Sequence, residues 1–242
     1  MSEGHNFENH EISPQPEVDF KSILESRELE SIETLEGYFP IQIIKLKDDG
    51  EALFKPEAEI PGLLLRYNKK EFMRTNFEIL ATQIDEILGF GLVPVATTRA
   101  INGRNGVIQK RVEDATVAAD IKGDWSELVD DSEILKAAVF DYLMDTRDRH
   151  AGNFLIDINA RKIWLVDHDY IMFFETIIPY RAIINAAVRK NLVKLPEEIK
   201  KSIENLLNRL NSISTDNNPE IQIILNTLKL KAEELLTRGT LA

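Results

Sequence analysis

The order of strand and helix patterns predicts an α+β protein with two lobes, a β-rich N-lobe over residues 19–112 and a helical C-lobe over residues 113–242. Two β-hairpin patterns and one helical pattern fill the first half, whereas several helical patterns and one hairpin fill the second. The chain of 242 residues is 43% hydrophobic, which is enough to form a core. Residues 1–18 are polar and include Pro14 and Pro16, so we expect a flexible tail there.

The charge and the residue types limit the function. The chain has 41 acidic and 29 basic residues, a net charge of −12, which argues against general binding of nucleic acids or anionic membranes but leaves room for a local anion pocket. The absence of cysteine excludes disulfides and thiolate metal sites. No apolar run approaches the roughly 18 residues of a membrane span. With no secretory signal in the first residues, we expect a cytoplasmic protein without a transmembrane segment.

The first elements of the N-lobe follow from apolar periodicity. Residues 19–35 place acids between apolar residues and predict a helix or a mixture of helix and strand. Over residues 40–56, a β-branched run, a turn at residues 48–50 and a second apolar run predict a hairpin. Pro56 ends its second strand because proline has no N–H to donate to a neighbouring strand.

A helix and a second hairpin complete the N-lobe. Apolar residues recur on one face over residues 74–88, and Gly89 is a natural stop, so a helix is predicted there. Residues 93–101 and 106–112 predict two strands joined by Asn102-Gly103-Arg104-Asn105, and the Asn-Gly pair is typical of a hairpin turn.

The C-lobe is predicted to begin with a polar connector over residues 112–131. Ser132 is expected to cap a helix that runs to about Met144. Strands over residues 154–157 and 163–166 then form another hairpin, and the remainder is predicted to be helical. Two of these later helices are expected to have proline at their first positions, Pro196 and Pro219.

The stretch that carries chemistry is DTRDRHAGNFLIDINARKIWLVDHD, residues 145–169. Its polar loop lies between a helix and two apolar strands, so the frame is expected to bring Asp148, Asn153 and Asp167 together. Two carboxylates and an amide oxygen are hard ligands that suit Mg²⁺.

The spacing of these residues matches that of protein kinases, which use a catalytic Asp, an Asn five residues later and a metal-binding Asp after a hairpin. Asp148 precedes Asn153 by five residues, and Asp167 lies fourteen beyond Asn153. Kinases also need a strand Lys that holds phosphates and a helix Glu that orients this Lys. Lys55 at a strand end and Glu78 on the next helix occur in that order.

The motif DRHAGN followed by LVDHD resembles the motifs of the phosphatidylinositol 3-/4-kinase-like superfamily, in which His follows the catalytic Asp. The closer resemblance is to small bacterial members of that superfamily. GEALFKP over residues 50–56 is similar to their GxxxxYKP-like strand, and LGFGLVP over residues 88–94 is similar to their LGxGLVP-like segment. The resemblance covers roughly residues 41–174. It implies a bilobal protein-kinase-like fold and a Mg²⁺-dependent enzyme that transfers a phosphoryl group from ATP.

The resemblance also implies roles for individual residues. Lys55 would contact the α- and β-phosphates of ATP, and Glu78 would pair with Lys55. The segment ending at Val112 would lead into the hinge that binds adenine. Asp148 would orient or deprotonate the acceptor hydroxyl, with His150 beside the transferred phosphoryl group.

The implied metal ligands are Asn153 and Asp167, and here the sequence departs from the family pattern. Asp169 stands where a Gly is usual, and it would act as a further ligand or instead repel phosphate. No GxGxxG precedes Lys55, so only Gly37 is available for a loop over the phosphates.

Each candidate also has a structural interpretation. Taken alone, Lys55 and Glu78 are typical surface charges, and Asp148, Asn153 and Asp167 are typical of residues that cap loops or strands. The neighbouring charges are interpreted as loop salt-bridge residues: Asp145, Arg147 and Arg149. The order of the whole set favours the enzyme.

The acceptor and two other functions stay open at this point. Residues 169–180 contain no Lys or Arg, which favours a hydroxyl on a protein or a small molecule over an anionic phosphoinositide headgroup. Basic residues reappear at Arg181, Arg189, Lys190 and Lys194, where a headgroup site would have to be assembled. The alternatives on the same fold are a nucleotide-binding pseudokinase that serves as an interaction module, and an enzyme that transfers AMP.

Overall fold

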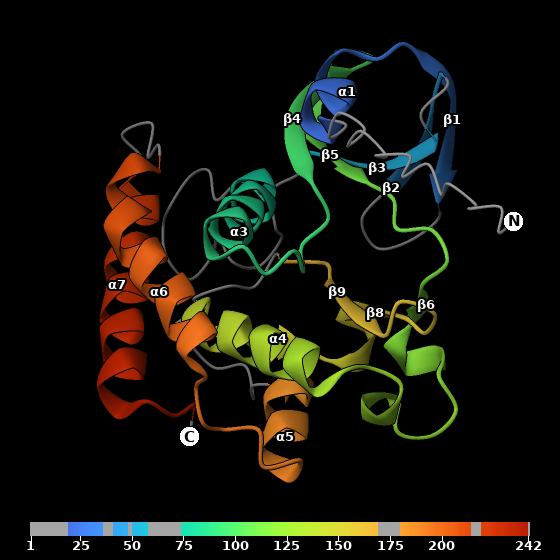
Figure 1. The fold of residues 1–242 in the computed structure, drawn as a ribbon. Coiled ribbons are helices and arrows are strands. Elements are labelled where there is room, and N and C mark those ends of the chain that lie inside the picture. Colours follow the sequence, from blue (N-terminus) through green and yellow to red (C-terminus); the bar gives the residue numbers. More distant parts are fainter. Residues whose placement is uncertain are drawn as a thin grey trace, which may run out of the picture.

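The computed structural model describes residues 19–35, 41–47, 50–57, 74–168, 180–213 and 219–241. The antiparallel sheet is built from the first half of the chain and most of the helices follow it, so the predicted α+β class is confirmed (Figure 1). The predicted tail over residues 1–18, Gly37 and the metal-ligand candidate Asp169 all lie outside the described residues.

Five antiparallel strands form the sheet, in the order β1-β2-β3-β5-β4. Their bounds are Leu29–Leu35 for β1, Ile41–Leu46 for β2, Gly50–Pro56 for β3, Ala96–Ile101 for β4 and Arg104–Lys110 for β5. Helix α1 (Phe20–Ser26) precedes β1, which confirms the mixture of helix and strand predicted for residues 19–35. This helix packs on β4, where Arg99 donates to the carbonyl oxygens of Leu24 at 2.9 Å and Arg27 at 2.7 Å.

The first hairpin of the sheet agrees with its prediction, whereas the second differs in its turn and in its outer ends, which lie at Ala96 and Lys110 rather than at residues 93 and 112. β2 pairs with β3, and β3 ends at Pro56, as predicted. The second hairpin has a two-residue turn rather than the four-residue connection predicted, because Arg104 pairs with Ile101 at the start of β5. Both turn residues, Asn102 and Gly103, have positive φ angles of 51° and 75°, as in the tight turns whose twist matches that of paired strands.

Two helices form the centre of the molecule. Helix α3 (Arg74–Leu88) has the predicted bounds and ends at Gly89, whose φ of 68° is a left-handed conformation that favours glycine. Helix α4 (Asp131–Leu143) begins before Ser132, so the prediction that Ser132 caps it is wrong. Asp130 is the N-cap, and its carbonyl oxygen accepts from the backbone N–H of residue 134 at 3.2 Å.

The rest of the C-lobe is built from short strands and three helices. The predicted hairpin is present as β8 (Phe154–Asp157) and β9 (Lys162–Leu165), with β6 (Thr116–Val117) beside β8. The remaining elements are η1 (Ala118–Asp120), η2 (Trp125–Glu127), β7 (Asp148–Arg149), η3 (Ala151–Asn153), β10 (Tyr180–Arg181), α5 (Ala182–Arg189), α6 (Glu197–Arg209), η4 (Leu210–Ser212) and α7 (Pro219–Arg238). Pro219 begins α7 as predicted, whereas Pro196 is the N-cap of α6. Each helix in the described ranges is too short or too polar to span a lipid bilayer.

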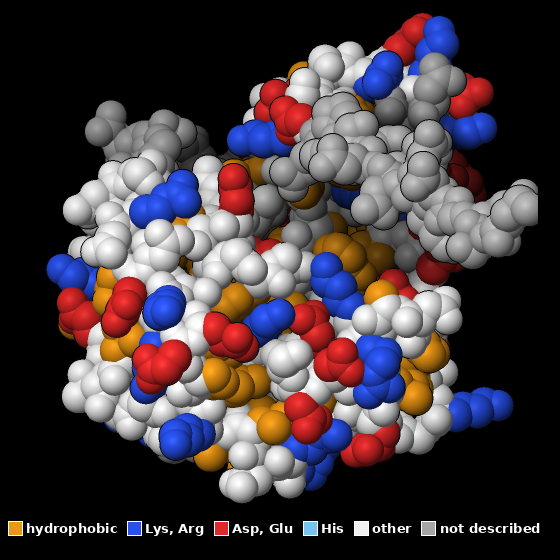
Figure 2. Space-filling model, in the orientation of Figure 1, with side chains coloured by type: hydrophobic (Ala, Val, Ile, Leu, Met, Phe, Trp, Pro, Cys, Tyr) orange, Lys and Arg blue, Asp and Glu red, His pale blue; other side chains and the backbone are white. Residues whose placement is uncertain are grey.

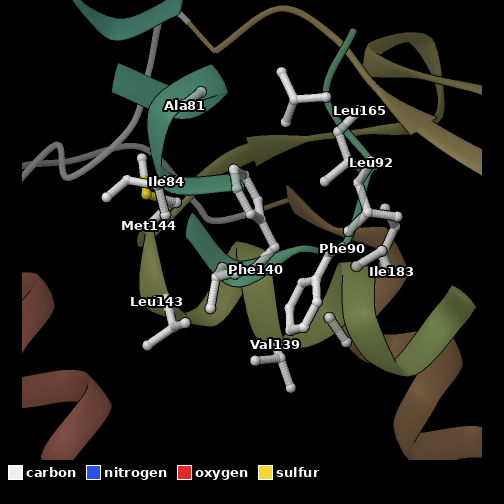
Figure 3. Packing of buried hydrophobic residues seen from close by; sticks show 14 of the residues in the cluster. Ala81, Ile84, Phe90, Leu92, Val139, Phe140, Leu143, Met144, Leu165 and Ile183 are labelled. Carbon is white, nitrogen blue, oxygen red and sulfur yellow. The ribbon is translucent and has the colours of Figure 1, made fainter. Parts of the chain in front are cut away.

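Buried apolar side chains form two clusters. The smaller one lies between α1 and one face of the sheet and includes Leu24, Phe54 and Ile108. The larger one joins α3 to the C-lobe helices and to the β8–β9 hairpin. Figure 3 shows its centre, where Ile84 of α3 lies near Phe140 of α4 and near Met144, the residue after α4. Because α3 shares this core with α4, the position of α3 side chains is fixed relative to the loop that follows α4.

Candidate functional site

Lys55 and Glu78 form a buried ion pair between the sheet and α3. Lys55 Nζ contacts Glu78 Oε1, and the two residues are 5% and 1% exposed. Strand β3 holds Lys55 opposite Val107 of β5. The preceding residue of β5, Gly106, has no room for a side chain, because a Cβ there would lie 2.5 Å from the Lys55 carbonyl oxygen. The glycine therefore permits the close approach of β5 to the strand that carries Lys55.

Glu78 also accepts hydrogen bonds from His168, just after β9. The backbone N–H of His168 lies 3.3 Å from Oε1, and its Nδ1 lies 3.0 Å from Oε2. Burial would raise the pKa of Glu78, but Lys55 and His168 outweigh it, so the pKa lies well below its usual range and Glu78 is ionised. Burial lowers the pKa of His168, so its ring is neutral and Nδ1 carries the hydrogen that it donates to Glu78.

Asp167 lies next to this ion pair. Its Oδ1 is 3.7 Å from Lys55 Nζ, and its side chain is 40% exposed. Its backbone φ is 58°, a left-handed conformation that is uncommon for residues other than glycine. The structure therefore brings three of the predicted site residues, Lys55, Glu78 and Asp167, into one group.

The loop after α4 holds the other predicted group, Asp148, His150 and Asn153. Asn153 Nδ2 donates to the Asp148 carbonyl oxygen at 2.8 Å and lies 3.5 Å from its carboxylate. His150 Nδ1 accepts from the Gly152 N–H at 3.0 Å, while Nε2 lies 3.9 Å from Asp148 Oδ1. A Cβ on Gly152 would lie 2.8 Å from the His150 ring, so any larger residue there would displace the ring from this position. Asp148 thus has a neighbour on each side that restricts its orientation.

Arg149 connects this loop to the strand that ends before Asp167. It is fully buried, and its Nε lies 3.0 Å from Asp141 of α4. Its Nη1 donates to the carbonyl oxygens of Asn153 and Val166, the latter at 2.8 Å. Val166 N–H donates in turn to the Asn153 carbonyl oxygen at 3.2 Å. The predicted salt-bridge role of Arg149 is confirmed, and the bonds also set the spacing between the two halves of the site.

Sequence reasoning missed two residues of this arrangement, Asp141 and His168. An Asp within an apolar helix, eight residues before a loop Arg, was the available signal for Asp141. His168 lies inside the LVDHD motif, but its partner is 90 residues away on α3.

Comparison with known proteins then identifies the fold. No family model matches the chain, and a search of curated proteins finds no match. Among solved structures, the crystal structure of the Golgi casein kinase has a TM-score of 0.55 and 13% sequence identity over 90% of this chain and 72% of that one. A structure of the Golgi casein kinase with Mn/ADP bound has a TM-score of 0.55, 12% identity, and coverage of 90% and 74%.

The fold is protein-kinase-like. The fold class predicted from the sequence is therefore confirmed, while membership of the phosphatidylinositol 3-/4-kinase-like superfamily stays a prediction. In this kinase-like fold, α3 supplies Glu78 to the Lys55 side chain of the sheet, and the loop after α4 supplies Asp148.

Val112 lies just past β5 and lines a cleft of about 520 Å³. Pro94 lines the cleft from the segment before β4, and Trp164 lines it from β9. Figure 2 shows a hollow between the part of the molecule that contains the sheet and the part below it. The Lys55–Glu78 pair is not among the residues that line this cleft.

The metal prediction rests on Asn153 and Asp167. Within the described ranges, no group of three or more His, Cys, Asp or Glu side chains is placed to hold a metal ion. The amide nitrogen of Asn153 is committed to Asp148, so its oxygen is the atom that it would offer to a cation. A carboxylate and an amide oxygen are donors that fit Mg²⁺, which usually completes its shell with water and phosphate oxygens.

Proposed function

We propose that this protein is an atypical kinase, a phosphotransferase that uses ATP and a divalent cation to phosphorylate a hydroxyl group. One observation carries the proposal. The buried Lys55–Glu78 ion pair lies beside Asp167, and backbone hydrogen bonds connect the Asp167 segment to the loop of Asp148 and Asn153. Protein kinases need such a Lys–Glu pair and such a metal-binding Asp to be in place together.

Lys55 binds the phosphates of ATP in this proposal. A lysine that is 5% exposed and paired with an ionised glutamate has its ammonium group held in one position. Glu78 supplies that orientation, and Asp167 at 3.7 Å supplies a second negative charge next to the ammonium. This arrangement places a cation and a potential metal ligand close together, as binding of a metal–nucleotide complex requires.

Asn153 and Asp167 would hold the Mg²⁺ ion, and Asp169 is a further candidate ligand from the sequence. The bound ion would neutralise charge on the phosphate oxygens as the phosphoryl group is transferred. Arg149 keeps the backbones of Asn153 and Val166 at a fixed spacing, which in turn positions the two ligands.

Asp148 orients the acceptor hydroxyl and accepts its proton. Its side chain is 27% exposed, so an acceptor can reach it, and its hydrogen-bonded neighbour Asn153 limits its rotation. His150 lies next to it with Nε2 towards the carboxylate, where it can contact the transferred phosphoryl group. Val112 belongs to the segment that contacts adenine.

The acceptor is more compatible with a protein or small-molecule hydroxyl than with a phosphoinositide. The absence of Lys and Arg over residues 169–180 removes the charges that an anionic headgroup requires, and the net charge of −12 adds to the repulsion.

The test is incubation with ATP labelled at the γ-phosphate, Mg²⁺ and a panel of hydroxyl acceptors. Asp148→Asn and Lys55→Met should each reduce transfer at least about 100-fold, because each removes a group that acts on the reacting atoms. The matched control is Asp120→Asn, an exposed Asp in η1, which should transfer at the wild-type rate.

Three results would contradict the proposed function or identify a different one. Equal transfer by wild type and Asp148→Asn contradicts the assignment of the site. Binding of ATP without turnover identifies a pseudokinase. A product that gains the mass of AMP instead of a phosphoryl group identifies nucleotidyl transfer.

A further inference from the structure

His168 connects the segment of Asp167 to α3. Its side chain is fully buried, and its ring meets Phe140 of α4 edge-on, with centroids 5.9 Å apart and planes at 72°. Apolar packing therefore holds one side of the ring, while a carboxylate faces another.

The contacts with Glu78 use both oxygens of that carboxylate. Oε1 accepts hydrogen bonds from Lys55 Nζ and from the backbone N–H of His168, while Oε2 accepts one from Nδ1 of His168. A carboxylate can only accept, so the contact fixes the hydrogen on Nδ1. Within the described part of the chain, Nε2 is buried and has no hydrogen-bond partner. The ring is therefore held through Nδ1 alone, in addition to its packing.

Asp167 lies between two anchored residues. On one side, Val166 is bonded through its N–H and its carbonyl oxygen to Asn153 and Arg149. On the other side, His168 is bonded to Glu78 through two donors. Asp167 itself has a φ of 58°, a region that residues with a side chain rarely adopt. A conformation of this kind persists only where the neighbouring structure determines it.

We propose that His168 is a positioning residue, whose hydrogen bond from Nδ1 to Glu78 holds Asp167 in its left-handed conformation beside Lys55. The consequence is that the cation site and the Lys55–Glu78 pair form together. A movement of α3 that displaces Glu78 releases the Asp167 segment, and release of that segment leaves Glu78 with Lys55 alone. The expected effect on phosphoryl transfer rests on the proposed function, whereas the expected effect on the conformation of the Asp167 segment does not.

Three substitutions separate the hydrogen bond from the shape of the ring. His168→Asn carries its amide N–H near the position of Nδ1, whereas His168→Gln carries it near Nε2. His168→Phe keeps the aromatic contact with Phe140 and removes the side-chain hydrogen bond. The backbone N–H bond to Glu78 is available in all three. Asn and Gln both introduce a buried amide of the same polarity. A difference between these two variants therefore depends on where the amide N–H lies.

The first experiment is hydrogen exchange of the backbone amides over residues 165–168, in protein without nucleotide or metal. His168→Phe and His168→Gln should increase the exchange rate there at least about tenfold at a temperature where all variants are folded. His168→Asn should stay within about threefold of wild type. Equal exchange in all four proteins, or equal acceleration by Asn and Gln, overturns the proposal.

The second experiment measures the rate of phosphoryl transfer against Mg²⁺ concentration. His168→Phe and His168→Gln should raise the half-saturating concentration of Mg²⁺ at least about tenfold, and His168→Asn should restore it to within about threefold of wild type. Unchanged Mg²⁺ dependence in His168→Phe contradicts the positioning role. If wild type transfers no phosphoryl group, the proposed function fails, while the exchange experiment still decides the role of His168.

Discussion

Two buried ion pairs are built from different parts of the chain. Arg149 and Asp141 are eight residues apart and come from the end of α4 and the loop that follows it. Lys55, Glu78 and His168 come from β3, from α3 and from the segment after β9, with Glu78 and His168 separated by 90 residues. Both pairs are almost completely buried, with side-chain exposures of 0% and 1% for the first and 6% and 1% for Lys55 and Glu78.

The sequence separation of the partners determines which parts of the fold each ion pair depends on. The Arg149–Asp141 pair can form as soon as α4 and its loop are folded, since both partners belong to one short stretch. The group of Lys55, Glu78 and His168 requires the sheet, α3 and the segment after β9 to be in place at once. We therefore expect the first pair to act mainly on stability and the second mainly on function.

The largest effect on stability is expected for Arg149→Met. It leaves Asp141 buried without a cation and removes the donor to the Asn153 and Val166 carbonyl oxygens, which should lower the free energy of unfolding by about 3–5 kcal/mol. Chemical denaturation measures the change. The matched control is Arg147→Met, because Arg147 is on the same loop but its side chain is 25% exposed and paired with Asp145, so its loss should cost less than about 1 kcal/mol. Equal costs for the two substitutions would contradict the comparison.

A third buried carboxylate, Asp85, differs from Asp141 and Glu78 because backbone N–H groups hold it instead of a side-chain cation. Its Oδ2 accepts from Leu92 N–H at 2.8 Å and Val93 N–H at 3.0 Å, in the turn that leads from α3 to β4. Burial raises the pKa of Asp85 from 3.8 to about 6, and the two backbone bonds only partly offset it.

The folded protein therefore binds a proton at Asp85 more tightly than the unfolded chain, so this contribution to stability is present below about pH 4 and is lost as the pH rises through 6. Asp85→Asn keeps an oxygen acceptor and cannot ionise. Relative to this variant, wild type should lose at most about 3 kcal/mol of unfolding free energy between pH 4 and 6.5. Parallel pH profiles of the two proteins would show that Asp85 has an ordinary pKa.

Glu78→Gln should cost less unfolding free energy than Arg149→Met but should reduce phosphoryl transfer strongly. Lys55 can still turn to Asp167 at 3.7 Å, so the cost in unfolding free energy should be about 2 kcal/mol, the value of a hydrogen bond to a charged group. Phosphoryl transfer should fall at least about tenfold, because Lys55 and His168 both lose their anionic partner. A variant that keeps full activity but loses as much stability as Arg149→Met would reverse the two roles.

The smallest effect is expected where an ion pair is exposed. Lys45 and Glu30 lie 3.2 Å apart on neighbouring strands, and their side chains are 55% and 52% exposed. Lys45→Met should change the free energy of unfolding by less than about 0.5 kcal/mol, because solvent screens such pairs. A cost near that of Arg149→Met would show that burial does not decide the strength of these pairs.

The sequence predicts much of this arrangement because order and spacing are local properties. The helix over residues 74–88 and both hairpins of the N-lobe follow from periodicity, and Lys55, Glu78 and Asp167 follow from the motif order. The cap of α4 was misplaced because Asp130 and Ser132 are both good capping residues, and only the backbone bonds distinguish them.

The residues that the sequence did not indicate are buried, and their hydrogen-bond partners come from other segments of the chain. His168 contacts a helix 90 residues earlier in the chain, and no spacing rule connects the two. Asp85 is a helix residue beside the apolar stripe, and its role becomes visible only when Leu92 and Val93 turn back towards it.

The most direct test of the central claim is a calorimetric titration of ADP with Mg²⁺ into wild type, Lys55→Met and Arg147→Met. Wild type and Arg147→Met should bind with the same affinity, and Lys55→Met should bind at least about tenfold more weakly. Binding that is equal in all three proteins, or absent from wild type, would contradict the assignment of the buried Lys55–Glu78 pair to a nucleotide.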